Sequence, residues 1–149
     1  FERYCTPNYN EAARVLHPSG KVLGSHMDGR LRSLAESIAK TELDVIEAFT
    51  PPPMGDLPVS EALSLWKEKV LWINYPSSVY VAGGPDAVRR HLFDLLKSVI
   101  PGDRIILAAS TENYVPVEVL RAITEVIEGA SYPLSEEAVE RIDTSLRLG

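Results

Sequence analysis

The sequence predicts an α/β fold built on a parallel β-sheet. Short apolar runs alternate four times with segments whose apolar residues recur at helical spacing, and no low-complexity linker interrupts the alternation. Strands that alternate with helices pair in parallel through right-handed crossovers, and their sheet is buried on both faces. We therefore expect one domain over residues 1–149, with a C-terminal helix or tail over 135–149. Four such units make either half of a closed eight-stranded barrel or a small doubly wound sheet, and the pattern does not choose between them.

The strands and helices of the four units are predicted from apolar runs, helical periodicity and the positions of proline. Apolar runs predict strands over residues 21–24, 44–49, 70–73 and 104–109. Helical periodicity predicts helices over residues 8–16, 31–39, 60–67, 85–99, 116–128 and 135–146. Pro85 fits a first helical turn and Ser135 fits an N-cap, whereas Pro51, Pro52 and Pro53 require a loop after the second strand.

Charge and cysteine content narrow the classes of partner and site. The chain has 15 Lys and Arg against 21 Asp and Glu, a net charge of −6, which argues against a nucleic-acid or anionic-membrane partner. Cys5 is the single cysteine, so an internal disulfide and a thiolate-rich zinc site are both excluded. No apolar run approaches the ~20 residues that span a bilayer, and no signal layout opens the chain. We expect a cytoplasmic protein, and further sequence before Phe1 because the chain begins without methionine.

Polar side chains follow the first three predicted strands, where parallel α/β proteins place their sites. His26 lies in the segment Ser25-His26-Met27-Asp28-Gly29, and its imidazole can act as general acid or base, metal ligand or carboxylate donor. The alternative is a loop-holding bond to a backbone carbonyl. Glu47 lies inside a strand, where a carboxylate that points into a barrel needs a partner or a function. Asn74 suits either substrate positioning or a turn, and Pro76-Ser77-Ser78 favours the turn.

Several segments together resemble the uroporphyrinogen decarboxylase superfamily. Ser25 to Gly29 is similar to its His-x-Asp-Gly or His-x-Cys-Gly turn, and residues 43–48 with 51–56 resemble its next strand and loop. Asn74 falls where the family's Gly-Asn-x-Asp turn ends a strand, and residues 83–88 resemble a helix start. Residues 104–109, with Glu112-Asn113 and the helix opening at Val115, are similar to the final barrel unit. The resemblance covers roughly residues 1–131.

The resemblance implies the C-terminal half of a (β/α)₈ TIM barrel, with a pocket at the C-terminal ends of the strands. It implies a carboxy-lyase acting on a tetrapyrrole or related small molecule, whose N-terminal half supplies an arginine-rich loop and a catalytic aspartate. Catalytic candidates are His26, Asp28, Glu47 and Glu112, and substrate-binding candidates are Arg30, Asn74, Asn113 and Tyr114. The histidine that the decarboxylases carry near the last strand is missing from residues 110–114, and this weakens uroporphyrinogen as the substrate.

Two other functions stay open at this point. The superfamily's corrinoid-dependent methyltransferases bind zinc through a His-x-Cys pair and a later cysteine. Asp28 stands in place of the first cysteine here, so only a harder site from His26 and Asp28 with Glu47 or Glu112 would remain, and Asp28 serves equally as a helix cap. We expect no resident cofactor, with zinc or a partner's corrinoid as the alternative. The second alternative is a non-catalytic module that forms a homodimer or joins a missing N-terminal half, because an open parallel sheet has two unpaired edges.

The remaining notable residues are expected to be structural. Trp66 and Trp72 are predicted to pack in the core, and His17 and His91 to lie at the surface or its boundary. Gly83-Gly84 before a helix is a weak signal for phosphate binding.

Overall fold

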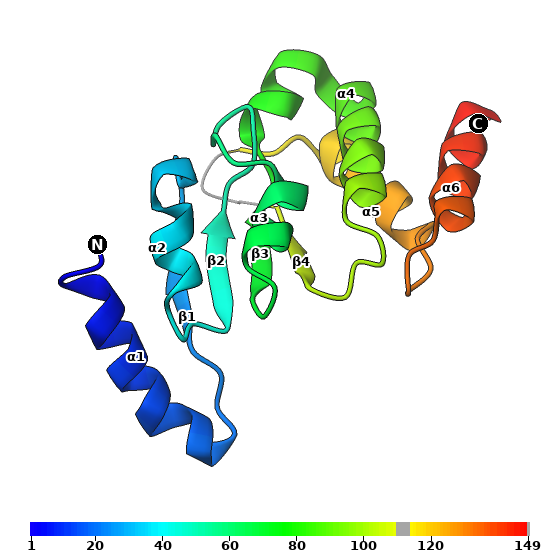
Figure 1. Ribbon diagram of the computed structural model, residues 1–149. Helices are drawn as coiled ribbons and strands as arrows, with labels where there is room; N and C mark the ends of the chain where they lie inside the picture. Colours follow the sequence, from blue (N-terminus) through cyan, green and yellow to red (C-terminus); the bar gives the residue numbers. More distant parts are fainter. Residues whose placement is uncertain (110–113, 149) are drawn as a thin grey trace. The chain divides into compact units, whose positions relative to one another are not determined.

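The computed structural model describes residues 1–109 and 114–148, and it divides into two compact units (Figure 1). The first unit comprises Phe1–Tyr75 and Arg104–Ala109, and the second comprises Pro76–Asp103 and Ser110–Gly149. The sheet, with the candidate residues on its strands, belongs to the first unit.

The first unit contains a four-stranded, all-parallel sheet, which confirms the predicted α/β class. Its strands run in the order β1-β2-β3-β4, so each pairs with the next along the chain. The strand bounds are β1 (Gly24–His26), β2 (Val45–Phe49), β3 (Val70–Asn74) and β4 (Ile105–Ala108). A doubly wound sheet instead reverses its strand order at a switch point, and these four strands show no reversal.

Three α-helices of the first unit pack on one face of this sheet. They are α1 (Cys5–Leu16), α2 (Ala35–Ala39) and α3 (Val59–Leu65). Ser25 in β1 donates a 3.0 Å hydrogen bond from its hydroxyl to the hydroxyl oxygen of Tyr9 in α1, and its register partner in β2 is the buried Ile46. Trp66, at the end of α3, donates its indole N–H to the carbonyl of Ala35 and packs edge-on against Phe49. Figure 1 shows α2 and α3 on the same side of the strands.

The opposite face of the sheet is open over part of its area, which corrects the expectation of burial on both faces. Alternation along the strands places His26, Glu47, Trp72, Asn74 and Ile106 on this face. Trp72 is 40% exposed and Ile106 is 43% exposed, and the two are register partners on β3 and β4. Trp66 is buried as predicted, whereas the prediction that Trp72 lies in the core is wrong.

Two short helical turns and the polar contacts of Asp44 complete the first unit. Two 3₁₀ turns, His17–Ser19 and Arg32–Leu34, follow α1 and precede α2. His17 is partly exposed, as expected, and its Nε2 lies 2.9 Å from Asp44 Oδ2. The same carboxylate oxygen accepts a 2.6 Å bond from the N–H of Leu23, so it ties the entry of β1 to the entry of β2.

The second unit is a packed set of three helices. They are α4 (Ser77–Ser98), α5 (Val117–Glu128) and α6 (Glu136–Leu148). Arg89 of α4 donates to Glu125 of α5 at 2.7 Å, and apolar residues of all three helices are buried: Val88, Leu92, Leu95, Leu96, Val119, Ala122, Val126, Ala138, Val139 and Ile142. Ser135 accepts a 3.2 Å bond from the N–H of Ala138, which confirms it as the N-cap of α6. None of the helices in the described part of the chain is long and apolar enough to cross a membrane.

Two predicted elements differ from the structure. The first strand begins at Gly24 rather than ending there, and the residues before it, Lys21 and Val22, are exposed. Helix α4 begins at Ser77, so the turn predicted from Pro76-Ser77-Ser78 is wrong. Gly84 breaks α4 with φ 63° and ψ −161°, and Pro85 opens its second segment, which is the helix that the sequence predicts.

Candidate functional site

The structure brings together two of the predicted catalytic residues, His26 and Glu47. His26 is the last residue of β1 and its register partner in β2 is Glu47, so both side chains leave the same face of the sheet. The imidazole Nδ1 lies 2.6 Å from Glu47 Oε2. The His26 side chain is 66% exposed, and its other ring nitrogen, Nε2, is therefore left for a substrate. A histidine held by a carboxylate through one nitrogen is a typical acid-base arrangement, because the carboxylate orients the ring and stabilises the imidazolium.

A backbone irregularity lies directly beside this pair. Strand β2 shifts register against β3 between Ile46 and Phe49. The shift includes Ala48, whose φ is 58°. Ala48 is the sole non-glycine residue with positive φ among residues 1–109 and 114–148. Such a conformation costs about 1–2 kcal/mol, and bulges of this kind re-aim neighbouring side chains next to functional sites. The bulge thus follows Glu47 immediately, at the point where its carboxylate meets His26.

The loops after β1 and β2 are fastened to each other by Arg32. Its backbone N–H donates to Asp56 Oδ1 and its Nε to the Asp56 carbonyl, both at 3.0 Å. Its two terminal nitrogens meet the two carboxylate oxygens of Glu61 at 2.6 and 3.0 Å, and these bonds raise the pKa of Arg32. Gly55 has no room for a side chain, because a Cβ there would lie 1.8 Å from the Thr50 carbonyl oxygen. No local pattern predicts this clamp, since its partners lie 24 and 29 residues from Arg32.

The other candidates in the first unit lie in the loop after β1 and at the end of β3. Asp28 and Arg30 are exposed in the loop after β1. Asp28 does not cap a helix: the 3₁₀ turn that follows begins at Arg32, with Leu31 at its N-cap and no side-chain cap bond. Asn74 is half-buried as the last residue of β3, on the same face of the sheet as His26.

Of the candidates from the last predicted loop, the structure describes Tyr114. Glu112 and Asn113 lie outside the described residues. Tyr114 is exposed and precedes α5. Gly83 and Gly84 lie at the break inside α4, directly before the segment that Pro85 opens, and phosphate binding there stays a prediction. His91 is half-buried in α4, at the boundary where it was expected.

A thiolate-rich zinc site does not fit these residues. Cys5 lies in α1, and within the described part of the chain no three side chains of His, Cys, Asp or Glu gather closely enough to hold a metal ion. His26 and Glu47 supply two possible ligands.

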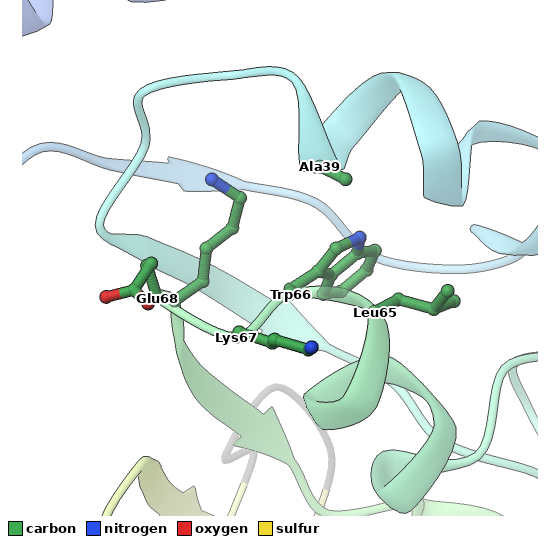
Figure 2. Close-up of a pocket in the computed structure, with 6 residues that line it drawn as sticks. Ala39, Leu65, Trp66, Lys67 and Glu68 are labelled. Atoms are coloured by element: carbon green, nitrogen blue, oxygen red, sulfur yellow. The ribbon is translucent and has the colours of Figure 1, made fainter.

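A hollow of about 320 Å³ lies at the other end of the sheet, among Ala39, Leu65, Trp66, Lys67, Glu68 and Lys69 (Figure 2). These residues end α2, end α3 and lead into β3, so the hollow is at the N-terminal side of that strand. Lys69 is 5% exposed and donates from Nζ to the carbonyls of Thr41 at 2.6 Å and Leu43 at 3.0 Å. Burial lowers the pKa of Lys69, and nearby Asp44 opposes this shift. In parallel (β/α) barrels, residues at the N-terminal ends of the strands usually contribute to stability, whereas active sites lie at the C-terminal ends.

The fold and the pair define a class: a parallel α/β protein with sequentially ordered strands and a carboxylate-oriented histidine at a strand end. Comparison of the chain with models of protein families, with curated proteins and with solved structures found no match. The geometry of the first unit therefore carries the functional argument.

Proposed function

We propose that the chain is the C-terminal part of a uroporphyrinogen decarboxylase-like enzyme, in which His26 transfers a proton to a carboxylate-bearing substrate. The observation that carries this proposal is the 2.6 Å contact between His26 Nδ1 and Glu47 Oε2 on the face of the sheet opposite the helices. It agrees with the functional role that the His26 segment suggests by its resemblance.

The one-sided packing of the first unit supports the barrel in this proposal. In a TIM barrel the strands follow one another in order, the helices lie outside, and the other face of the sheet lines the interior. Doubly wound sheets carry helices on both faces. Strands β1 to β4 run in sequential order with α1, α2 and α3 on one face, so His26 and Glu47 would point into the interior of a completed barrel.

The pair suits the loss of a carboxyl group as CO₂. As an imidazolium, His26 donates its Nε2 proton to a ring carbon of the substrate, and the negatively charged Glu47 stabilises the cation before transfer. The bond to the carboxylate then breaks, CO₂ leaves, and the electron pair of that bond neutralises the protonated ring by forming an exocyclic methylene group. A proton from solvent adds to the methylene carbon, and the ring carbon returns its proton to His26, so one proton replaces the carboxyl group overall. Arg30, exposed in the loop after β1, would attract the carboxylates of the substrate.

The test is formation of coproporphyrinogen from uroporphyrinogen by the chain, alone and mixed with the N-terminal four βα units of an established uroporphyrinogen decarboxylase. We expect activity in the mixture, and a loss of about 100-fold or more in kcat for His26→Ala, the range typical of general acid-base catalysis. His17→Ala is the matched control, because His17 also contacts a carboxylate, Asp44 at 2.9 Å, but lies before β1. Absence of product in every mixture, or full activity in His26→Ala, would overturn the proposal.

A further inference from the structure

One row of side chains crosses all four strands on the face of the sheet opposite the helices. His26 of β1 is the register partner of Glu47 in β2. Trp72 of β3 is the register partner of Ile106 in β4. The row therefore begins with an imidazole and a carboxylate and continues with an indole and an aliphatic side chain.

The pairing of β2 with β3 joins the two halves of this row. Ile46 is the register partner of Leu71, and both side chains are completely buried. The next residue along each strand is Glu47 in β2 and Trp72 in β3. Since successive side chains point to opposite faces and neighbouring strands lie about 4.8 Å apart, the carboxylate and the indole are neighbours on the other face. β2 and β3 are the two inner strands, so this arrangement is fixed within the sheet.

The indole adds a ring-binding surface to the proton-transferring pair. Glu47 holds His26 through Nδ1 at 2.6 Å, and Nε2 is left for the substrate. An indole favours a second aromatic ring, stacked or edge-on with the ring centres about 4.5–7 Å apart, beyond what the buried area alone supplies. In the closed barrel of the proposed function the row lines the interior, and Trp72 faces the same substrate as His26. A ring on Trp72 has its edge toward the imidazole.

The reaction itself requires a conjugated ring at this place. A ring carbon accepts the proton of His26, and the ring then takes up the electron pair of the bond that breaks. A saturated ring can do neither, so a residue that selects conjugated rings beside His26 selects substrates that can react.

We propose that Trp72 is a specificity-determining residue of the His26–Glu47 site. Its indole packs against the substrate ring that receives the proton, and the site takes planar, conjugated rings that carry a carboxylate in preference to saturated ones. The proposal rests on the proposed function and narrows its substrate class.

The test compares two acids of equal charge whose six-membered rings differ in conjugation. Benzoate is planar and conjugated, whereas cyclohexanecarboxylate is saturated. We expect calorimetric titration of the intact chain to give an affinity about fivefold or more higher for benzoate, which is the size of an aromatic pair contribution. Equal affinities, or no binding of benzoate at millimolar concentration, would overturn the proposal.

Variants assign the preference to the indole. Trp72→Leu should bring the ratio of the two affinities to about one, and Trp72→Phe should keep most of it, because phenylalanine retains a ring. Ile106→Ala is the matched control: Ile106 is the apolar register partner of Trp72, 43% exposed, and has no ring, so the ratio should be unchanged. Circular dichroism verifies that each variant folds. A ratio that persists in Trp72→Leu, or that is lost in Ile106→Ala, would contradict the role of Trp72.

The indole N–H signals in an NMR spectrum give a second readout. The chain has two tryptophans, and Trp66 is an internal reference because its N–H is bonded to the Ala35 carbonyl in the core. Benzoate should shift the signal of Trp72 and leave that of Trp66 in place, and an unmoved Trp72 signal would count against the proposal.

Binding and turnover separate this inference from the proposed function. A ring preference that depends on Trp72, without coproporphyrinogen formation, would contradict the decarboxylase function and leave Trp72 as the ring-binding residue. Coproporphyrinogen formation by Trp72→Leu with the kcat and KM of the wild type would contradict this inference alone.

Discussion

At the scale of single residues, the most informative position is Ala48. It is buried in β2 with φ 58°, a left-handed conformation that L-residues other than glycine, asparagine and aspartate rarely adopt. Its carbonyl accepts a 3.0 Å bond from the Thr50 hydroxyl, which helps to hold this geometry. The strain lies between Glu47, which meets His26, and the loop that Arg32 fastens. A local cost of this kind persists where surrounding contacts over-determine the backbone.

Ala48→Val should destabilise the chain by more than about 2 kcal/mol, since a β-branched side chain at positive φ adds backbone strain to overpacking. Ala48→Gly should stay within about 1 kcal/mol of the wild type, because relief of strain offsets the lost methyl group and the more flexible unfolded chain. Urea denaturation of the two variants measures both values. Equal stability of Ala48→Val and the wild type would show that the bulge relaxes without cost.

Lys69 is the second residue whose environment sets a measurable property. Its Nζ donates to two backbone carbonyls, and burial lowers its pKa from the ordinary value of 10.5. Between the folded-state pKa and 10.5 the unfolded chain binds more protons than the folded one, so stability rises with pH across that window. Below the folded-state pKa the charge is present in both states and its burial cost is fully felt.

Lys69→Met should therefore remove a pH dependence as well as two hydrogen bonds. We expect the variant to be less stable at all pH values, by about 1–3 kcal/mol for carbonyls left without a donor. The advantage of the wild type should grow as the pH rises from 7 toward 10. Urea denaturation of both proteins across this range gives the difference curve. A difference that falls with pH would contradict the lowered pKa of Lys69.

At the scale of elements, pattern predicted those parts of the fold that local chemistry determines. β2, β3 and α3 follow from apolar runs and proline positions, and Ser135 caps α6 as expected. The predicted first strand lies too early in the chain. The run from Lys21 to Gly24 is apolar enough for a strand, but pairing with β2 begins only at Gly24. The first segment of α4 is not predicted, since Ser77, Ser78 and two glycines are typical of a turn, whereas the chain is helical from Ser77 to the break at Gly84.

The candidate site was predictable to the same degree. The sequence points to His26 because an imidazole at a strand end can act as an acid or base, and to Glu47 because a carboxylate inside a strand needs a partner or a function. In-register parallel pairing brings the two together. The Arg32 clamp and the register shift at Ala48 were not predictable, since each depends on side chains or backbone from loops far apart in sequence. The exposure of Trp72 is not predictable for a related reason. The sequence of an apolar strand does not show which face of the sheet the helices cover.

At the scale of the whole molecule, the first unit is assembled from two separate stretches of chain. Phe1–Tyr75 contributes three strands, and Arg104–Ala109 returns to add β4 after the helix α4 has intervened. Arg104 also donates to the carbonyls of Leu63 at 3.1 Å and Trp66 at 2.9 Å, so it closes the end of α3. The three-stranded stretch thus depends on a segment that comes 28 residues after it ends, from Pro76 to Asp103.

A fragment of residues 1–75 should consequently fail to fold cooperatively, whereas a fragment of residues 1–109 should retain the first unit. Removal of β4 opens the edge of β3 and takes the Arg104 bonds from two carbonyls, and several lost hydrogen bonds at about 1 kcal/mol each approach the 5–15 kcal/mol that hold a typical domain together. Trp66 reports the outcome, because its indole is buried against Phe49 and Ala35 when the unit is folded. The shorter fragment should show solvent-exposed Trp66 emission and no urea transition, and the longer one a blue-shifted emission lost in a single step. A cooperative transition in residues 1–75 would place the stability of the sheet in its first three strands alone.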